Sequence, residues 1–216
     1  MEADRSTPAT PRPAATVILL RRGSTHRRSG LEILMLKRGR EARFMPGVWV
    51  FAGGVVEDAD RAVSLPPDAG NIQEGEWAHR VCGARELGEE ASVELEPAAL
   101  LPWSRWITPE QVPLRFDTRF YVGLAPPHSK PEPEPSEMDE ALWTTPEAAL
   151  EAEGAGEMEI SFPTVRHLHQ LAEFADADAV IAAARERKVD ALLPRIRKHG
   201  AGIEVLLPGD EGYEDA

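Results

Sequence analysis

Three glutamates stand close together in the segment Arg85-Glu86-Leu87-Gly88-Glu89-Glu90. On a helix, with about 100° between successive residues, Glu86, Glu89 and Glu90 fall within one arc of roughly 100°. Carboxylates at that spacing repel each other by roughly 3 kcal/mol per pair when partly shielded from water. Mg²⁺ and Mn²⁺ prefer carboxylate oxygens and would relieve this repulsion. The spacing is compatible with a divalent cation site, and for a cluster taken alone a solvated acidic face is the alternative.

The surrounding segments favour the cation site. The opposite side of a helix over residues 76–91 carries apolar residues for a core, namely Val81, Ala84, Leu87 and Ala91. Upstream, the apolar run 44–52 ends at Gly53 and Gly54, which predicts a strand entering a tight turn with close backbone approach. Downstream, the acidic run 136–140 precedes a short apolar strand. Together these segments predict a cavity that combines a glycine turn with a carboxylate helix.

These residues resemble the box of the Nudix hydrolases, Gly-x5-Glu-x7-Arg-Glu-U-x-Glu-Glu-x-Gly-U, where U is a bulky aliphatic residue. Gly54 matches the opening glycine, and the second half is matched by Arg85, Glu86, Leu87, Glu89, Glu90 and Val93. The resemblance implies an α/β/α sandwich with a mixed sheet, to which this chain adds C-terminal helices. It also implies an enzyme that hydrolyses a nucleoside diphosphate linked to another group, with Mg²⁺ or Mn²⁺ as cofactor.

The chain departs from this pattern at two places. An insert of residues 57–75 interrupts the first half, and Trp77 stands eight positions before Arg85, so either Glu74 or Glu76 replaces the box glutamate. Ser92 takes the place of the glycine after the helix, where a left-handed C-cap would cost serine about 1 kcal/mol. The long insert is similar to that of the Nudix subgroup that includes the peroxisomal coenzyme A diphosphatases.

The resemblance assigns roles to particular residues. It implies metal ligands at Glu86, Glu89, Glu90 and, less directly, Glu76, with one of them acting partly as a base. Arg85 would orient a carboxylate or the glycine turn, and Glu137 or Glu140 would supply a general base or an outer ligand. A solvated loop edge is the alternative for these last two.

Substrate contacts are expected beside the glycine turn. Gly53 and Gly54 would allow close backbone approach, and Arg38 and Arg43 belong to a basic stretch that could grip phosphate. An ordinary solvated strand end is the alternative for any single arginine. Trp103, Trp106 and Trp143 could stack on a base, but large aromatic residues more often belong to the core.

Composition limits the partners. The 216 residues carry a formal net charge of −13, which argues against binding to nucleic acid or to anionic membranes. The one cysteine, Cys82, excludes an internal disulfide and fits a cytoplasmic location. No apolar run is long enough for a membrane span, and the N-terminus lacks a signal-peptide pattern. We expect a small nucleotide-derived substrate as partner, and a homodimer is left open.

The chain is expected to form one Nudix domain over residues 16–207, between a disordered tail, 1–15, and a short C-terminal tail, 208–216. Strands are predicted at 16–21, 31–37, 48–51, 100–107, 118–124, 142–144 and 203–207. Helices are predicted at 76–91, 146–152, 163–174 and 177–187. The insert and the proline-rich segment 126–135 are expected to be loops.

Coenzyme A or an acyl derivative is the leading candidate substrate. ADP-ribose, a dinucleotide polyphosphate or an oxidised nucleotide would keep the same chemistry. A non-catalytic Nudix domain that senses a nucleotide metabolite is the alternative of another class. Retention of the three glutamates argues against that alternative.

Overall fold

A mixed β-sheet forms the centre of the structure. Its strands are β1 (Arg12–Arg22), β2 (Leu31–Arg38), β3 (Trp49–Val50), β4 (Ala52–Val55), β5 (Leu101–Ile107), β6 (Phe116–Leu124), β7 (Met138–Thr144) and β8 (Ala191–Leu192). They follow the order β3-β2-β1-β6-β5-β8, while β4 pairs with β1 and β7 pairs with β2. The computed structural model of the chain describes residues 8–23, 30–42, 44–67, 69–70, 72–199 and 202–215.

The first strand lies at the middle of this sheet. β1 pairs in parallel with β6 and antiparallel with β2 and β4. Residues 17–20 of β1 and 31–36 of β2 are all buried. Such continuous buried runs are typical of strands covered on both faces, because side chains alternate between the two sides.

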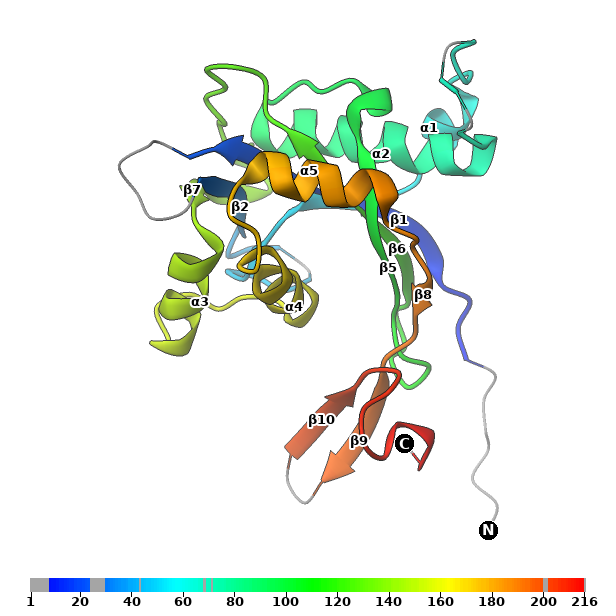
Figure 1. Cartoon of the computed structure of the whole chain (residues 1–216). Helices are drawn as coiled ribbons and strands as arrows, with labels where there is room; N and C mark the ends of the chain where they lie inside the picture. The colour runs from blue at the N-terminus through cyan, green and yellow to red at the C-terminus, as the bar shows by residue number, and fades with distance from the viewer. Residues whose placement is uncertain are drawn as a thin grey trace.

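Helices cover both faces of the sheet, as Figure 1 shows. On one face, α2 (Glu74–Ala91) packs Leu87 and Ala91 against Val17 and Leu19 of β1. On the other face, α3 (Pro146–Gly154), α4 (Phe162–Leu171) and α5 (Ala177–Glu186) pack against a second core cluster that contains Ile18 and Leu20. The predicted α/β/α sandwich with a mixed sheet is confirmed. Among the described residues, every helix is too short or too polar to traverse a lipid bilayer.

Several predicted boundaries were wrong. β1 begins at Arg12, and Ala14 and Ala15 are buried, so the expected disordered tail is wrong for residues 12–15. The insert contains a short helix, α1 (Asp58–Ala62), rather than loop alone. The expected glycine turn is instead strand β4, in which Gly53 pairs with Thr16. The expected close backbone approach is nevertheless present, since a Cβ on Gly53 would lie 2.5 Å from the Ala15 carbonyl oxygen.

The C-terminal part contains a two-stranded hairpin separate from the main sheet. Its strands are β9 (Arg195–His199) and β10 (Gly202–Leu206), and only the second was expected from the sequence. Two short 3₁₀ helices, η1 (Pro97–Ala99) and η2 (Tyr213–Asp215), complete the fold.

Helix α2 ends at Ser92, which adopts the expected left-handed conformation with φ of 54°. Its backbone N–H donates to the Gly88 carbonyl oxygen over 3.0 Å, so the cap bonds are made despite the strain. We predict that Ser92→Gly raises the free energy of unfolding by about 1 kcal/mol, because glycine adopts this conformation without steric cost. Urea unfolding of both proteins checks this, with Ser92→Ala as the control that should bring no gain.

A buried histidine joins α4 to the sheet. The Nδ1 atom of His167 lies 2.6 Å from the Pro163 carbonyl oxygen, and Nε2 lies 2.6 Å from the Ser104 hydroxyl. The carbonyl can only accept, so Nδ1–H donates to it, and Nε2 accepts from Ser104. Burial lowers the pKa of His167 to about 4. The neutral ring is therefore the form that the folded state requires.

We predict that His167 makes the fold sensitive to acid. An unfolded histidine titrates near 6.5, so the unfolded state binds a proton first as the pH falls towards 4. The free energy of unfolding should therefore drop by about 2 kcal/mol more between pH 7 and pH 5 in the wild type than in His167→Gln. Urea unfolding at both pH values measures the difference. Equal pH dependence in the two proteins would contradict the prediction.

Candidate active site

A cavity of about 720 Å³ brings the predicted residues together. One end of the cavity is polar and lies between the glycine strand β4 and helix α2. It is lined there by Arg38, Gly53, Gly54, Glu57, Arg85, Glu86, Glu89, Glu90 and Glu137. The three box glutamates therefore share a cavity with the two glycines, although Glu89 itself is largely exposed.

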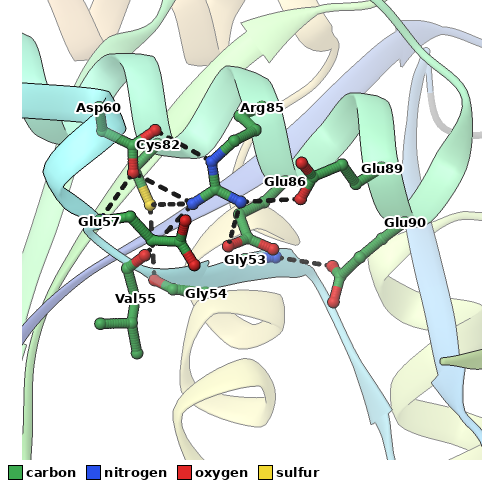
Figure 2. Close-up of polar contacts among 10 residues, drawn as sticks. All are labelled: Gly53, Gly54, Val55, Glu57, Asp60, Cys82, Arg85, Glu86, Glu89 and Glu90. Atoms are coloured by element: carbon green, nitrogen blue, oxygen red, sulfur yellow. Dashed lines mark hydrogen bonds and ion pairs between the residues drawn. The ribbon is translucent and has the colours of Figure 1, made fainter. Parts of the chain in front are cut away.

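Glu90 is the most deeply buried of the three glutamates, with 3% of its surface exposed. Its Oε2 accepts a hydrogen bond of 2.9 Å from the backbone N–H of Gly53 (Figure 2). The pKa of Glu90 is raised to about 8, because burial and the neighbouring Glu86 outweigh the lowering effect of this hydrogen bond. The charged form is therefore costly here without a nearby cation.

Glu86 lies directly against Gly54. A Cβ atom on Gly54 would overlap the carboxylate of Glu86, so a larger residue at this position would displace that carboxylate. Burial raises the pKa of Glu86, and ion pairing with Arg85 offsets only part of this rise. Two carboxylates, Glu86 and Glu90, are thus held beside the backbone of β4 in an environment that resists negative charge.

Arg85 is the counter-charge in this cluster, as Figure 2 shows. Its Nη1 lies 2.9 Å from Glu86 Oε1 and donates to Glu89 Oε2 over 2.7 Å. Its Nη2 donates to the carbonyl oxygen of Val55 over 3.2 Å. This places Arg85 as a bridge between α2 and β4, in keeping with the expected orienting role.

Asp60, the main partner of Arg85, was not predicted from the sequence. Asp60 is 1% exposed and accepts hydrogen bonds of 2.9 and 3.1 Å from Arg85. Burial alone would raise the pKa of Asp60, but the bonds from Arg85 and from the Glu57 N–H outweigh it, and the pKa falls. Counting forward from Gly54 would have found it, since Asp60 follows after five intervening residues, as the box glutamate does.

Glu76 does not join the cluster. It forms an ion pair with Arg80 on the next turn of α2 and another with Arg119, which attaches the first turns of α2 to β6. Ten residues of helix separate it from Glu86, a rise of about 15 Å. This separation argues against Glu76 as a ligand of a cation held by Glu86.

Glu137 lines the cavity, whereas Glu140 pairs with Lys37 and does not. The proline-rich loop positions Glu137, because the Glu134 N–H donates to the carbonyl oxygen of Glu90 over 3.1 Å. Glu137 lies close enough to raise the pKa values of Glu86 and Glu90.

Of the two expected phosphate contacts, Arg38 lines the cavity and Arg43 lies outside the described residues. The Nε atom of Arg38 donates to the Phe44 carbonyl oxygen over 2.9 Å, which fixes the plane of the guanidinium. Of the three tryptophans, Trp103 is in the core, Trp143 lies under Arg21, and Trp106 both packs in the core and lines the cavity.

The donor set fits a divalent cation. Within the described part of the chain, no three His, Cys, Asp or Glu side chains already surround a single point. The carboxylates at this end of the cavity nevertheless offer the hard oxygen donors that Mg²⁺ and Mn²⁺ prefer. Burial raises the pKa values of Glu86 and Glu90, and a bound cation would stabilise their charged forms.

Comparison with known proteins agrees with this geometry. A family model described as NUDIX domain matches residues 10–165. Putative nudix hydrolase 7 of Caenorhabditis elegans is 30% identical over 240 residues, covering 94% of this chain and 75% of the relative. Acyl-coenzyme A diphosphatase NUDT19 of Homo sapiens is 26% identical over 273 residues, covering 85% of this chain and 72% of the relative.

Solved structures show the same fold. A NUDIX hydrolase from Alicyclobacillus acidocaldarius superimposes with a TM-score of 0.68 at 25% identity, covering 80% of this chain and 96% of that one. The NUDIX domain of Shewanella oneidensis NrtR superimposes with a TM-score of 0.53 at 13% identity, covering 76% and 88%. The family model covers most of the chain and the glutamates of the box face one cavity, so this chain belongs to the Nudix family and is a Nudix pyrophosphohydrolase.

Proposed function

We propose that this enzyme is a metal-dependent diphosphatase acting on coenzyme A or acyl-coenzyme A. The observation that carries the proposal is the convergence of Glu86, Glu89 and Glu90 on a cavity bordered by the glycines of β4. The relatives named acyl-coenzyme A diphosphatase, which match most of the chain, support this substrate.

Glu86, Glu89 and Glu90 would hold the cation. When bound, Mg²⁺ or Mn²⁺ neutralises phosphate oxygens and lowers the pKa of a bound water. Arg85 keeps Glu86 and Glu89 oriented, and the Gly53 N–H keeps Glu90 oriented. Because these contacts are fixed in the fold, little reorganisation is needed when the substrate binds.

The remaining cavity residues would act on the diphosphate and the attacking water. Arg38 can donate to phosphate oxygens, since guanidinium matches phosphate geometry. Glu137 faces the same space and would accept a proton from water as it attacks phosphorus. The water oxygen forms a bond to phosphorus as the bridging P–O bond breaks, and two phosphate monoesters leave.

We predict that the wild type with Mg²⁺ or Mn²⁺ converts coenzyme A to 3′,5′-ADP and phosphopantetheine. Glu90→Gln should lower kcat/KM by at least about 100-fold, because a lost cation contact removes several kcal/mol of transition-state stabilisation. The fold should survive, since glutamine can still accept the Gly53 N–H bond and avoids a buried charge. Chromatographic separation of the products measures the rate.

Glu140→Gln is the matched control, because Glu140 lies outside the cavity and pairs with Lys37. Its activity should stay within twofold of the wild type. Cleavage of ADP-ribose or a dinucleotide polyphosphate, with coenzyme A untouched, would replace the proposed substrate. Undiminished activity of Glu90→Gln would contradict the assigned ligand, and binding without any turnover would favour a sensing domain.

We predict that Asp60 is a positioning residue that acts through Arg85. Asp60→Asn removes the charge that holds Arg85, so the affinity for Mn²⁺ and kcat/KM should each fall by about tenfold or more. Asp60→Glu should restore both, because it keeps the carboxylate. Calorimetric Mn²⁺ titration and steady-state kinetics provide the readouts.

Asp58→Asn serves as the control, because Asp58 is an exposed residue of the same short helix. It should change neither quantity. A purely structural role for Asp60 would lower the free energy of unfolding while leaving Mn²⁺ affinity unchanged in the folded protein.

A further inference from the structure

The cavity continues from the carboxylates to an apolar end. Four strand spacings separate Gly53 on β4 from Leu192 on β8 through β1, β6 and β5, a distance of about 19 Å along the sheet. Gly53 and Pro194, which stands two positions after Leu192, both line one continuous space of about 720 Å³. This space extends well beyond what a diphosphate and its cation need.

The far wall is aliphatic. It is formed by Val112 and Leu114 from the loop between β5 and β6, and by Pro194, Ile196 and Val205 from the C-terminal segment. Figure 1 shows the β9–β10 hairpin beyond the end of the sheet, next to that loop. Leu114 remains 45% exposed, so its side chain is not packed into the protein core.

One face of the hairpin points into the cavity. Ile196 and Val205 are cross-strand partners that line it, whereas Arg197 and Glu204 are the next pair along. Side chains alternate between the faces of a strand, so this charged pair lies on the opposite face, where two hydrogen bonds of 3.0 and 2.7 Å join it. The hairpin is thus amphipathic, with its apolar side turned to the cavity.

The hairpin is held in place by the C-terminus. Arg195 donates to the Tyr213 carbonyl oxygen over 2.8 Å and stacks over the Tyr213 ring. The Tyr213 hydroxyl donates to the Leu193 carbonyl oxygen over 2.7 Å. These contacts join the start of the hairpin to the C-terminal residues.

Polar side chains near this end are already engaged within the protein. The Thr108 hydroxyl accepts from the Phe116 N–H over 3.0 Å, and the Ser161 and Thr164 hydroxyls lie 2.8 Å apart in a hydrogen bond. A nucleobase has polar edges that need hydrogen-bond partners, and the aliphatic wall supplies none. An aliphatic chain needs only apolar contact.

We propose that the β9–β10 hairpin determines specificity by forming the binding site for the acyl chain of the substrate, with Ile196 and Val205 as its contact residues. This inference rests on the proposed function, since the acyl chain is carried by the coenzyme A whose diphosphate lies at the carboxylate end. The hairpin follows residue 165, so it lies outside the part of the chain that the family model matches.

The test compares free coenzyme A with dodecanoyl-coenzyme A. Ile196→Asn and Val205→Asn should each lower kcat/KM for the dodecanoyl substrate by about tenfold and leave that for free coenzyme A within twofold. Arg197→Asn, which places the same side chain on the opposite face, should leave both unchanged. Circular dichroism establishes that each variant is folded.

A binding measurement separates this inference from the proposed hydrolysis. Calorimetric titration with dodecanoyl-pantetheine, which lacks the diphosphate, should show binding to the wild type and about tenfold weaker binding to Ile196→Asn. That result would support the apolar site even if no diphosphate were cleaved. Equal effects of Ile196→Asn on both coenzyme A substrates, or acyl-pantetheine binding unaffected by Ile196→Asn, would overturn the inference.

Discussion

A single guanidinium organises the acidic end of the cavity. Arg85 is shared by Asp60, Glu86 and Glu89, and it also reaches the backbone of β4. Carboxylates at this density would otherwise repel one another, and a partly buried helix could not carry them. Hydrogen bonding to Asp60 raises the pKa of Arg85, so the positive charge persists at any pH the fold tolerates. The insert thus contributes to the site, because Asp60 of α1 holds Arg85 in place.

The two ends of the cavity differ in chemistry: one is charged and the other is apolar. At β4, Gly53 and Gly54 have no side chains, so the carboxylates of the glutamates lie directly against the strand backbone. Negative charge is therefore concentrated at this end of the cavity. At the C-terminal hairpin, side chains of Ile196 and Val205 present apolar surface. A molecule that joins a diphosphate to an aliphatic chain would satisfy both ends at once, whereas a small nucleotide would leave the apolar end wet.

The box helix could be predicted from the sequence because its signal is local: helical spacing alone places Glu86, Glu89 and Glu90 on one side. The resemblance to Nudix hydrolases supplied the layered fold. Contacts between residues far apart in the sequence could not be predicted from such local spacing. Glu76 finds its partner Arg119 across 43 residues, and nothing in its neighbourhood distinguishes it from a ligand. Asp60 was missed because the whole insert was placed between Gly54 and the box acid, whereas most of the insert follows Asp60. Strand β9 was missed because Arg195, Arg197 and Lys198 hide the alternation of a two-stranded ribbon.

The central position of β1 has a consequence for how the chain folds. Ala14 pairs with Thr118, so a strand made at the start of synthesis gains its parallel neighbour only after about 100 further residues have been added. Closing so long a loop costs conformational entropy before the strand contacts can form and stabilise the pairing. Folding that depends on many such long-range pairings is slow. Until β6 has been synthesised, one edge of β1 lacks its partner strand, and an unpaired strand edge exposes the unfinished chain to aggregation.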